Sequence, residues 1–274
     1  MARTTTVRTA AKSAKAGRQP KLREAKSVEK DTKDLVHVIR PGVRCDTEER
    51  GHKTPNGRSV LEIVVDASEG FIPLWAKGTT LRWKFRESSF ESFDDPQALK
   101  ARVEELFAKA VLRWEDAAPI KFARKDDAWD FEILVRQSDN CDVNGCVLAS
   151  AFFPDAGRHK LTIYPKIFSQ NPDEQIETLV HEIGHVFGLR HFFAQVSETA
   201  WPSIVFGVHN KFSIMNYGAN SKLTADDKAD LKKLYQLAWS GQLTEINGTP
   251  IKFVTPFHSS GEEAIASVKA TEPA

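Results

Sequence analysis

The feature that most constrains this chain is the run HEIGHVFGLRH, which begins at His181. Its pattern is His-Glu-x-x-His-x-x-Gly-x-x-His. On a helix, His181 and His185 lie one turn apart on one face, so both imidazoles can reach a single ion. Glu182 lies beside them, and Gly188 can take a positive φ that turns the chain and brings His191 back as a third ligand. The spacing therefore predicts a metal site with three neutral imidazoles.

Three imidazole ligands predict a catalytic Zn²⁺ site. Such a site leaves one position open for water, whereas a structural zinc site is normally closed by four protein ligands, often cysteines. Zinc lowers the pKa of its bound water towards ~7 and polarises a substrate carbonyl. Glu182 can then accept the proton of that water and deliver it to the leaving amine. These residues predict peptide-bond hydrolysis, and a helix with incidental surface histidines is the alternative.

The same run is similar to the zinc signature of the metzincin metallopeptidases. A second hallmark of that group, a methionine turn beneath the zinc, is matched by SIMNYG, in which the methionine is Met215. By this resemblance Met215 provides an apolar floor under the ligands, and Tyr217 looks like the tyrosine of astacins and serralysins that can ligate zinc and stabilise the oxyanion. A phenol donor near the developing charge would lower the barrier. For Tyr217, a packed turn without a catalytic function is the alternative.

Resemblance to the matrixins covers roughly residues 79–238, through the segments LRWKF, VLRWEDAAPIKF and CVLASAFFPDAGRHKLTIYP. It implies an α/β (α+β) metzincin-like zinc-protease fold, with a five-stranded, mostly parallel twisted sheet and three main helices. In that fold the segment matching Val147–Phe153 is an edge strand that binds an extended substrate as an added strand. Phe192 and Tyr217 depart from the matrixin pattern, so the assignment within the group stays open. No calcium loop is found.

Local patterns predict where the strands and helices lie. Asp95 and Asn171, each followed by proline, are typical N-caps of helices, and Thr224 begins a capping-box spacing before a third helix that ends at Trp239. From Gly248 onward the turn residues favour irregular structure. Apolar and β-branched runs predict strands at residues 60–65, 81–85, 120–123, 131–136, 147–153 and 160–164.

Composition and charge suggest the domain organisation. The chain is 41% hydrophobic and 27% charged, which is typical of soluble globular proteins, and no apolar run is long enough to span a bilayer. Nine of its 38 Lys and Arg residues but only two of its 37 acidic residues precede Asp31, in a segment without the apolar region of a secretory signal. We expect a disordered basic tail at 1–30, an N-terminal extension or pro-segment at 31–78, a metzincin-like catalytic domain at 79–240 and a C-terminal extension at 241–274.

The chain has three cysteines, so at least one thiol has no partner within it. Cys141 and Cys146 lie five positions apart in CDVNGC, close enough for a local disulfide in an oxidising compartment. Cys45 lies in RPGVRCD, which is loosely similar to the matrixin pro-segment motif whose cysteine thiolate occupies the open zinc position. An extra residue breaks the Pro-Arg-Cys spacing, and Asp46 replaces the usual glycine. An ordinary loop cysteine is therefore the preferred interpretation, and an inhibitory switch is the alternative.

These observations together predict a zinc-dependent endopeptidase with Zn²⁺ as its cofactor. The expected partner is a peptide or protein substrate in an extended conformation, with no nucleic acid for the catalytic domain, no membrane, and a monomeric chain. Two alternatives stay open, a zinc-binding interaction module without catalysis and a binder of anionic polymers through the basic tail. Localisation is also open between the cytoplasm and export by a route that needs no signal peptide.

Overall fold

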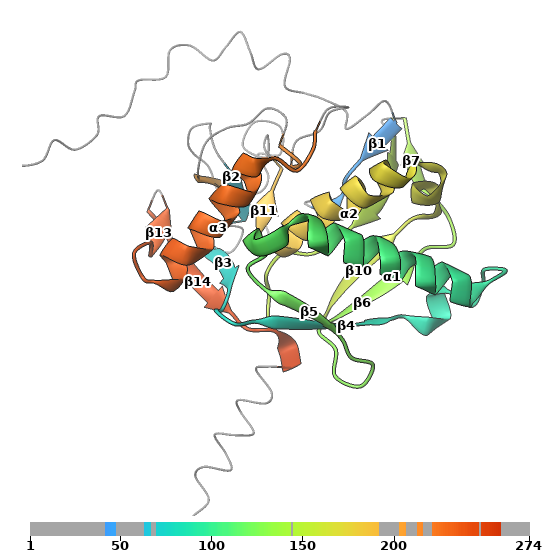
Figure 1. Ribbon diagram of the computed structural model, residues 1–274, viewed down its shortest axis with the longest axis horizontal. Coiled ribbons are helices and arrows are strands. Elements are labelled where there is room, and N and C mark those ends of the chain that lie inside the picture. The colour runs from blue at the N-terminus through green and yellow to red at the C-terminus, as the bar shows by residue number, and fades with distance from the viewer. Residues whose placement is uncertain are drawn as a thin grey trace, which may run out of the picture. The chain divides into compact units, whose positions relative to one another are not determined.

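The central layer of the protein is a five-stranded sheet in the order β5-β4-β6-β10-β9 (Figure 1). The computed structural model describes residues 42–47, 63–66, 70–143, 145–191, 203–206, 213–215, 221–246 and 248–258, all within one compact unit. The five strands are β4 (Thr80–Phe85), β5 (Lys121–Arg124), β6 (Phe131–Val135), β9 (Ala149–Ser150) and β10 (His159–Ile163). Neighbouring strands are parallel, except that β9 runs antiparallel to β10. The predicted five-stranded, mostly parallel sheet is confirmed.

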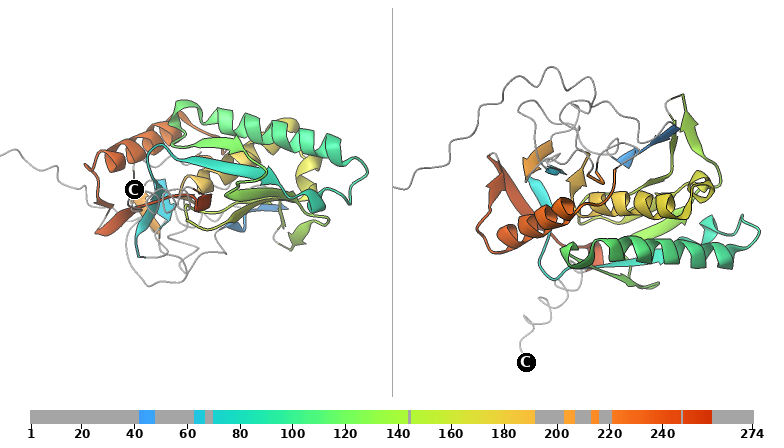
Figure 2. Two further views of the ribbon diagram at one scale, coloured as in Figure 1. Left: turned by 90° about the horizontal axis from the view of Figure 1, so that it is seen from below. Right: turned by 45° about the horizontal axis from the view of Figure 1, so that its top comes forward.

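Three long helices accompany the sheet, as predicted: α1 (Pro96–Arg113), α2 (Pro172–Val186) and α3 (Ala225–Trp239). Figures 1 and 2 show α1 and α2 running side by side. Their starts are fixed by local chemistry, because the side chains of Asp95 and Asn171 accept hydrogen bonds from the first-turn amides of Ala98 and Glu174, each at 2.9 Å. A capping box at Thr224 starts α3. Among the described residues, three short 3-10 helices lie between these elements, η4 (Glu87–Ser89), η5 (Glu115–Ala117) and η6 (Pro165–Ser169).

The described residues also form three smaller sheets. The first joins β1 (Gly42–Arg44), β8 (Gly145–Val147) and β7 (Asn140–Asp142). The second joins β11 (Leu189–Arg190), β2 (Ile63–Asp66) and β12 (Ser203–Phe206). The third joins β13 (Glu245–Ile246), β14 (Thr249–Val254) and β3 (Ile72–Trp75).

Two predictions about the strands were wrong. The segment 147–153 is not one strand. Its first residue is the last residue of β8, which belongs to the first small sheet, whereas β9, also within this segment, pairs with β10 in the central sheet. The chain after Gly248 is not irregular, because β14 forms a parallel ladder with β3, beside which it lies in Figure 1. The turn residues near Gly248 mark only the tight connection between β13 and β14.

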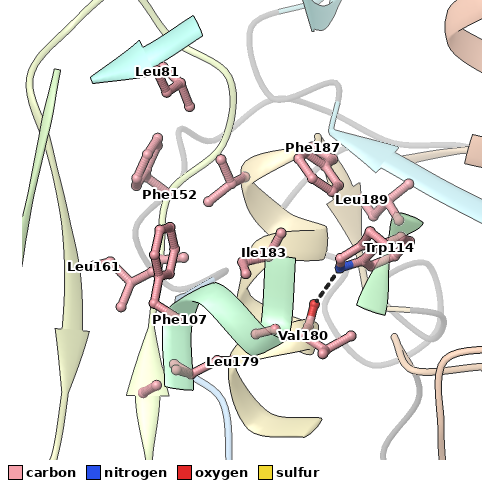
Figure 3. Close-up of a cluster of buried hydrophobic side chains, with 14 of the residues drawn as sticks. Leu81, Phe107, Trp114, Phe152, Leu161, Leu179, Val180, Ile183, Phe187 and Leu189 are labelled. Atoms are coloured by element: carbon pink, nitrogen blue, oxygen red, sulfur yellow. Dashed lines mark hydrogen bonds between the residues drawn. The ribbon is translucent and has the colours of Figure 1, made fainter. Parts of the chain in front are cut away.

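The core lies between α1, α2 and the sheet (Figure 3). Phe107 of α1 packs edge-to-face against Trp83 of the sheet, with ring centroids 5.5 Å apart. Trp114 is fully buried, and its indole N–H donates to the carbonyl of Val180 on α2 at 3.2 Å (Figure 3). This contact joins the end of α1 to the middle of α2, one residue before the predicted metal ligands begin.

The C-terminal end of α2 is held by side chains from β3 and α3. The last carbonyls of a helix have no partner within the helix and must find one elsewhere. Trp75 donates its indole N–H to the carbonyl of Val186 at 2.7 Å, and the hydroxyl of Tyr235 donates to the carbonyl of Phe187 at 3.0 Å. Burial raises the pKa of Tyr235, so this hydroxyl stays a proton donor. The chain is therefore fixed at the point where it leaves the helix.

Of the helices that the structure describes, none combines the length and the hydropathy needed to cross a lipid bilayer.

Candidate metal centre

The three predicted histidine ligands converge. Nε2 of His191 lies 3.0 Å from Nε2 of His181 and 3.2 Å from Nε2 of His185. Three nitrogens bound to one tetrahedral zinc at the usual bond length would lie about 3.3 Å apart. All three rings are buried, and His185 is fully shielded from solvent. The donor set therefore fits a small divalent cation.

Backbone carbonyls orient two of these rings. Nδ1 of His181 lies 2.8 Å from the carbonyl oxygen of Ile214, and Nδ1 of His185 lies 2.7 Å from that of Leu189. Because a carbonyl oxygen only accepts hydrogen bonds, Nδ1 of each ring is the donor, which leaves Nε2, the nitrogen turned toward the other histidines, as the atom that would bind a metal. Sequence reasoning missed these two partners, since backbone carbonyls leave no signal in a motif.

Gly188 makes the turn that returns the chain to the site. Its φ is +92°, and its amide donates to the carbonyl of His185 at 2.8 Å. The next residues form β11, which pairs antiparallel with β2 and leads directly to His191. A Cβ at this position would lie 3.4 Å from the carbonyl oxygen of Pro73, in a backbone conformation that disfavours side chains. The turn proposed from the sequence is present.

Gly184 lets Met215 pack directly against α2. A Cβ at Gly184 would lie 2.5 Å from Sδ of Met215 and 3.4 Å from a ring carbon of Trp114. Met215 is buried, and its amide donates to the hydroxyl of Ser213 at 3.1 Å. Tyr217, the second predicted catalytic residue, lies outside the described residues.

Gly184→Ala is expected to lower the free energy of unfolding by about 1–3 kcal/mol, because the added methyl overpacks the contact with Met215. The sign of this change in the free energy of unfolding is what tests the contact. An unobstructed Gly-to-Ala change inside a helix stabilises by about 1 kcal/mol, which is the opposite direction. Urea unfolding of the zinc-loaded protein measures the effect.

The control for this prediction is the same change made in a Met215→Ala background. There the added methyl has room, so the loss caused by Gly184→Ala should shrink or reverse. An equal loss in the two backgrounds would show that Met215 is not the obstructing residue.

Glu182 lies beside the three rings and is 1% exposed. Its Oε2 accepts a hydrogen bond from the hydroxyl of Thr47 at 2.7 Å, and the same hydroxyl accepts from the amide of Ala151 at 3.0 Å. Thr47 therefore bridges the predicted catalytic carboxylate and the chain that follows β9. No motif in the sequence predicts a role for this threonine.

The thiol of Cys45 also lies in the site. Its Sγ is 3.3 Å from Oε1 of Glu182 and 3.6 Å from Nε2 of His185. Together with the three histidines it forms a group whose ligand atoms all lie within 4.8 Å of one another. Burial, and next the charge of Glu182, raise the pKa of the Cys45 thiol, whereas a bound cation acts in the opposite direction. The interpretation of Cys45 as an ordinary loop cysteine was wrong.

β1, the strand that precedes Cys45, pairs with an edge of β8 near the candidate metal site. β1 pairs in parallel with β8, with Gly42 opposite Gly145 and Arg44 opposite Val147. β7, on the other side of β8, is tied to it by a disulfide between Cys141 and Cys146, so the pairing left open by the sequence is present. Arg44 also forms an ion pair with Asp142 of β7 at 3.3 Å. The chain's own N-terminal segment thus pairs with β8, whose last residue, Val147, begins the segment that was expected to bind the substrate.

The sequence from residue 75 to residue 236 matches the family model described as matrixin. A similar curated protein is the macrophage metalloelastase of Rattus norvegicus, which is 29% identical over 166 residues, 56% of this chain and 33% of the relative. The chain therefore spans about a third of that relative's length. Among solved structures, myroilysin is similar with a TM-score of 0.40 and 14% identity, over 63% of this chain and 98% of that one.

The family match covers more than half of the chain, including the five-stranded sheet, α1 and α2. The family match places the chain in the class of zinc metallopeptidases. The chain belongs to the matrixin family.

Proposed function

We propose that this chain is a zinc-dependent endopeptidase in which His181, His185 and His191 hold Zn²⁺ and Glu182 is the catalytic base. The observation that carries the proposal is the convergence of three Nε2 atoms beside a buried carboxylate. When bound, Zn²⁺ supplies Lewis-acid chemistry toward a peptide carbonyl. Glu182 takes a proton from the attacking water at its carboxylate and passes it to the leaving nitrogen.

We further propose that the described conformation is a latent one. The thiol of Cys45 lies beside the three imidazoles, Thr47 holds one oxygen of Glu182, and β1 pairs with β8. Each of these contacts takes up a group that a substrate or a water would need. Cleavage therefore requires the segment Gly42–Thr47 to leave the site.

The proposed activity is tested by a peptide-library digest with the full chain carrying Cys45→Ala, followed by sequencing of the products. We expect cuts at interior peptide bonds that stop when a zinc chelator is added and resume when zinc is restored. A chelator-insensitive digest would point to a contaminating protease. No cleavage by a zinc-loaded protein would instead favour a zinc-binding interaction module.

A further inference from the structure

A pocket beside the candidate metal centre has an acidic wall. Its lining includes His181 and Glu182, together with Glu174 and Glu177 from the preceding turns of α2. Glu177 lies four residues before His181, so both side chains project from the same face of the helix. Glu174 and Glu177 are both half-buried, so solvent screens their charges less than it would screen fully exposed carboxylates.

The rest of the lining is apolar or neutral, except for one basic residue. Leu148 and Ile214 supply apolar surface, and Thr178 supplies a hydroxyl. Among the described lining residues other than His181, the one basic side chain is Arg44. Arg44 belongs to β1, the segment that we propose must leave before cleavage. Once β1 leaves, that guanidinium leaves the pocket with it.

The position of the pocket indicates which substrate residue reaches it. Arg44 lies opposite Val147, and the next residue, Cys45, enters the metal site. A substrate that adds to β8 antiparallel, the slightly more stable pairing, would carry its carboxyl-side residues from the metal site toward Gly145. These substrate residues would take the places of Val43 and Arg44, which both line the pocket.

We propose that this pocket binds a Lys or Arg side chain on the carboxyl side of the cleaved bond. The aliphatic stem of such a side chain packs on Leu148 and Ile214, while its cation approaches Glu177 and Glu174. The substrates are then peptides with a basic residue directly after the scissile bond. This inference rests on the proposed endopeptidase function and adds its specificity.

The test uses four peptides that differ only at the residue after the scissile bond, which is Lys, Arg, norleucine or Glu. Norleucine has a chain like that of lysine without the charge. With the full chain carrying Cys45→Ala, kcat/KM for the Lys and Arg peptides should exceed that for norleucine roughly 10-fold, as a partly screened charge pair allows, and the Glu peptide should be the poorest. Equal rates for Lys and norleucine would overturn the proposal.

Variants identify the wall residue responsible. Glu177→Gln should reduce the preference for Lys over norleucine, and Glu177→Lys should shift the preference toward the Glu peptide. Glu105→Gln on α1 is the matched control, because Glu105 is 63% exposed and does not line the pocket. It should leave the preference unchanged. A preference that survives Glu177→Lys would exclude this residue as the specificity determinant.

A binding measurement separates this proposal from the proposed catalysis. The same four peptides are titrated by calorimetry into zinc-loaded chain carrying Cys45→Ala and Glu182→Gln, which is expected to bind without cleaving. An order of affinities in which the Lys and Arg peptides bind most tightly, norleucine next and Glu most weakly supports an acidic pocket. It does so even if the chain that keeps Glu182 hydrolyses no peptide. Equal affinities would reject the pocket, and cleavage without this order would leave only the endopeptidase proposal standing.

Discussion

Replacement of Glu182 by glutamine is expected to lower kcat/KM for peptide cleavage by roughly 10²–10⁴-fold, the usual contribution of a general base. Glutamine has nearly the same shape, and its amide oxygen can still accept the hydrogen bond from Thr47. It has no carboxylate to take the proton from water. The variant should therefore retain zinc and fold while losing turnover.

The measurement combines initial rates on an internally quenched peptide with the zinc content per chain, both in the Cys45→Ala background. Asp173→Asn is the control, because it makes the same carboxylate-to-amide change at an exposed position in the first turn of α2. It should leave the rate unchanged within about twofold. Cleavage by the Glu182→Gln chain at the control rate would reject Glu182 as the base. Joint loss of zinc and cleavage would instead assign it a structural role.

Replacement of Cys45 by serine is expected to raise the cleavage rate on the order of 100-fold, the scale of benefit that a tethered ligand gains from its high local concentration. Serine is a poor ligand for zinc compared with a thiolate. The contacts of Sγ with Glu182 and His185 would also be weakened. Initial rates of the wild-type chain and the variant measure the effect.

A thiol-blocking reagent provides an independent arm of this experiment. It should raise the rate of the wild-type chain and have no effect on Cys45→Ser. Thr47→Val tests the neighbouring contact, since it removes the hydroxyl that bridges Glu182 and the amide of Ala151 while keeping the thiol. A smaller rise is expected for it. Identical rates for the wild-type and Cys45→Ser chains would reject latency through this thiol.

The parts of the structure that the sequence predicted depend on local chemistry. The caps at Asp95 and Asn171 and the turn at Gly188 each follow from interactions within a few residues. The histidine spacing belongs to this class, since His181 and His185 share one helical face by periodicity alone. Such features can be read from neighbouring letters because the residues that make them are neighbours.

The parts that the sequence did not predict depend on contacts between distant segments. Gly248 and Pro250 favour turns and so predict irregular structure where β14 lies, yet the ladder of β14 with β3 joins residues far apart in the chain. The broken motif spacing around Cys45 predicts an ordinary loop residue. Its place is set by the pairing of β1 with β8, together with the bond from Thr47 to Glu182. Neither contact has a signature in the residues beside Cys45.

The pairing of β1 with β8 has a consequence for how the proposed latent state responds to dilution. Because the blocking segment and the metal site belong to one chain, the segment is present at a fixed effective concentration, however dilute the protein becomes. A single cut between Thr47 and β2 would convert the segment into a separate peptide that dilution removes. Before the cut, the inhibition would not depend on the protein concentration. After the cut it would be lost in a single step, which cleavage of the chain triggers.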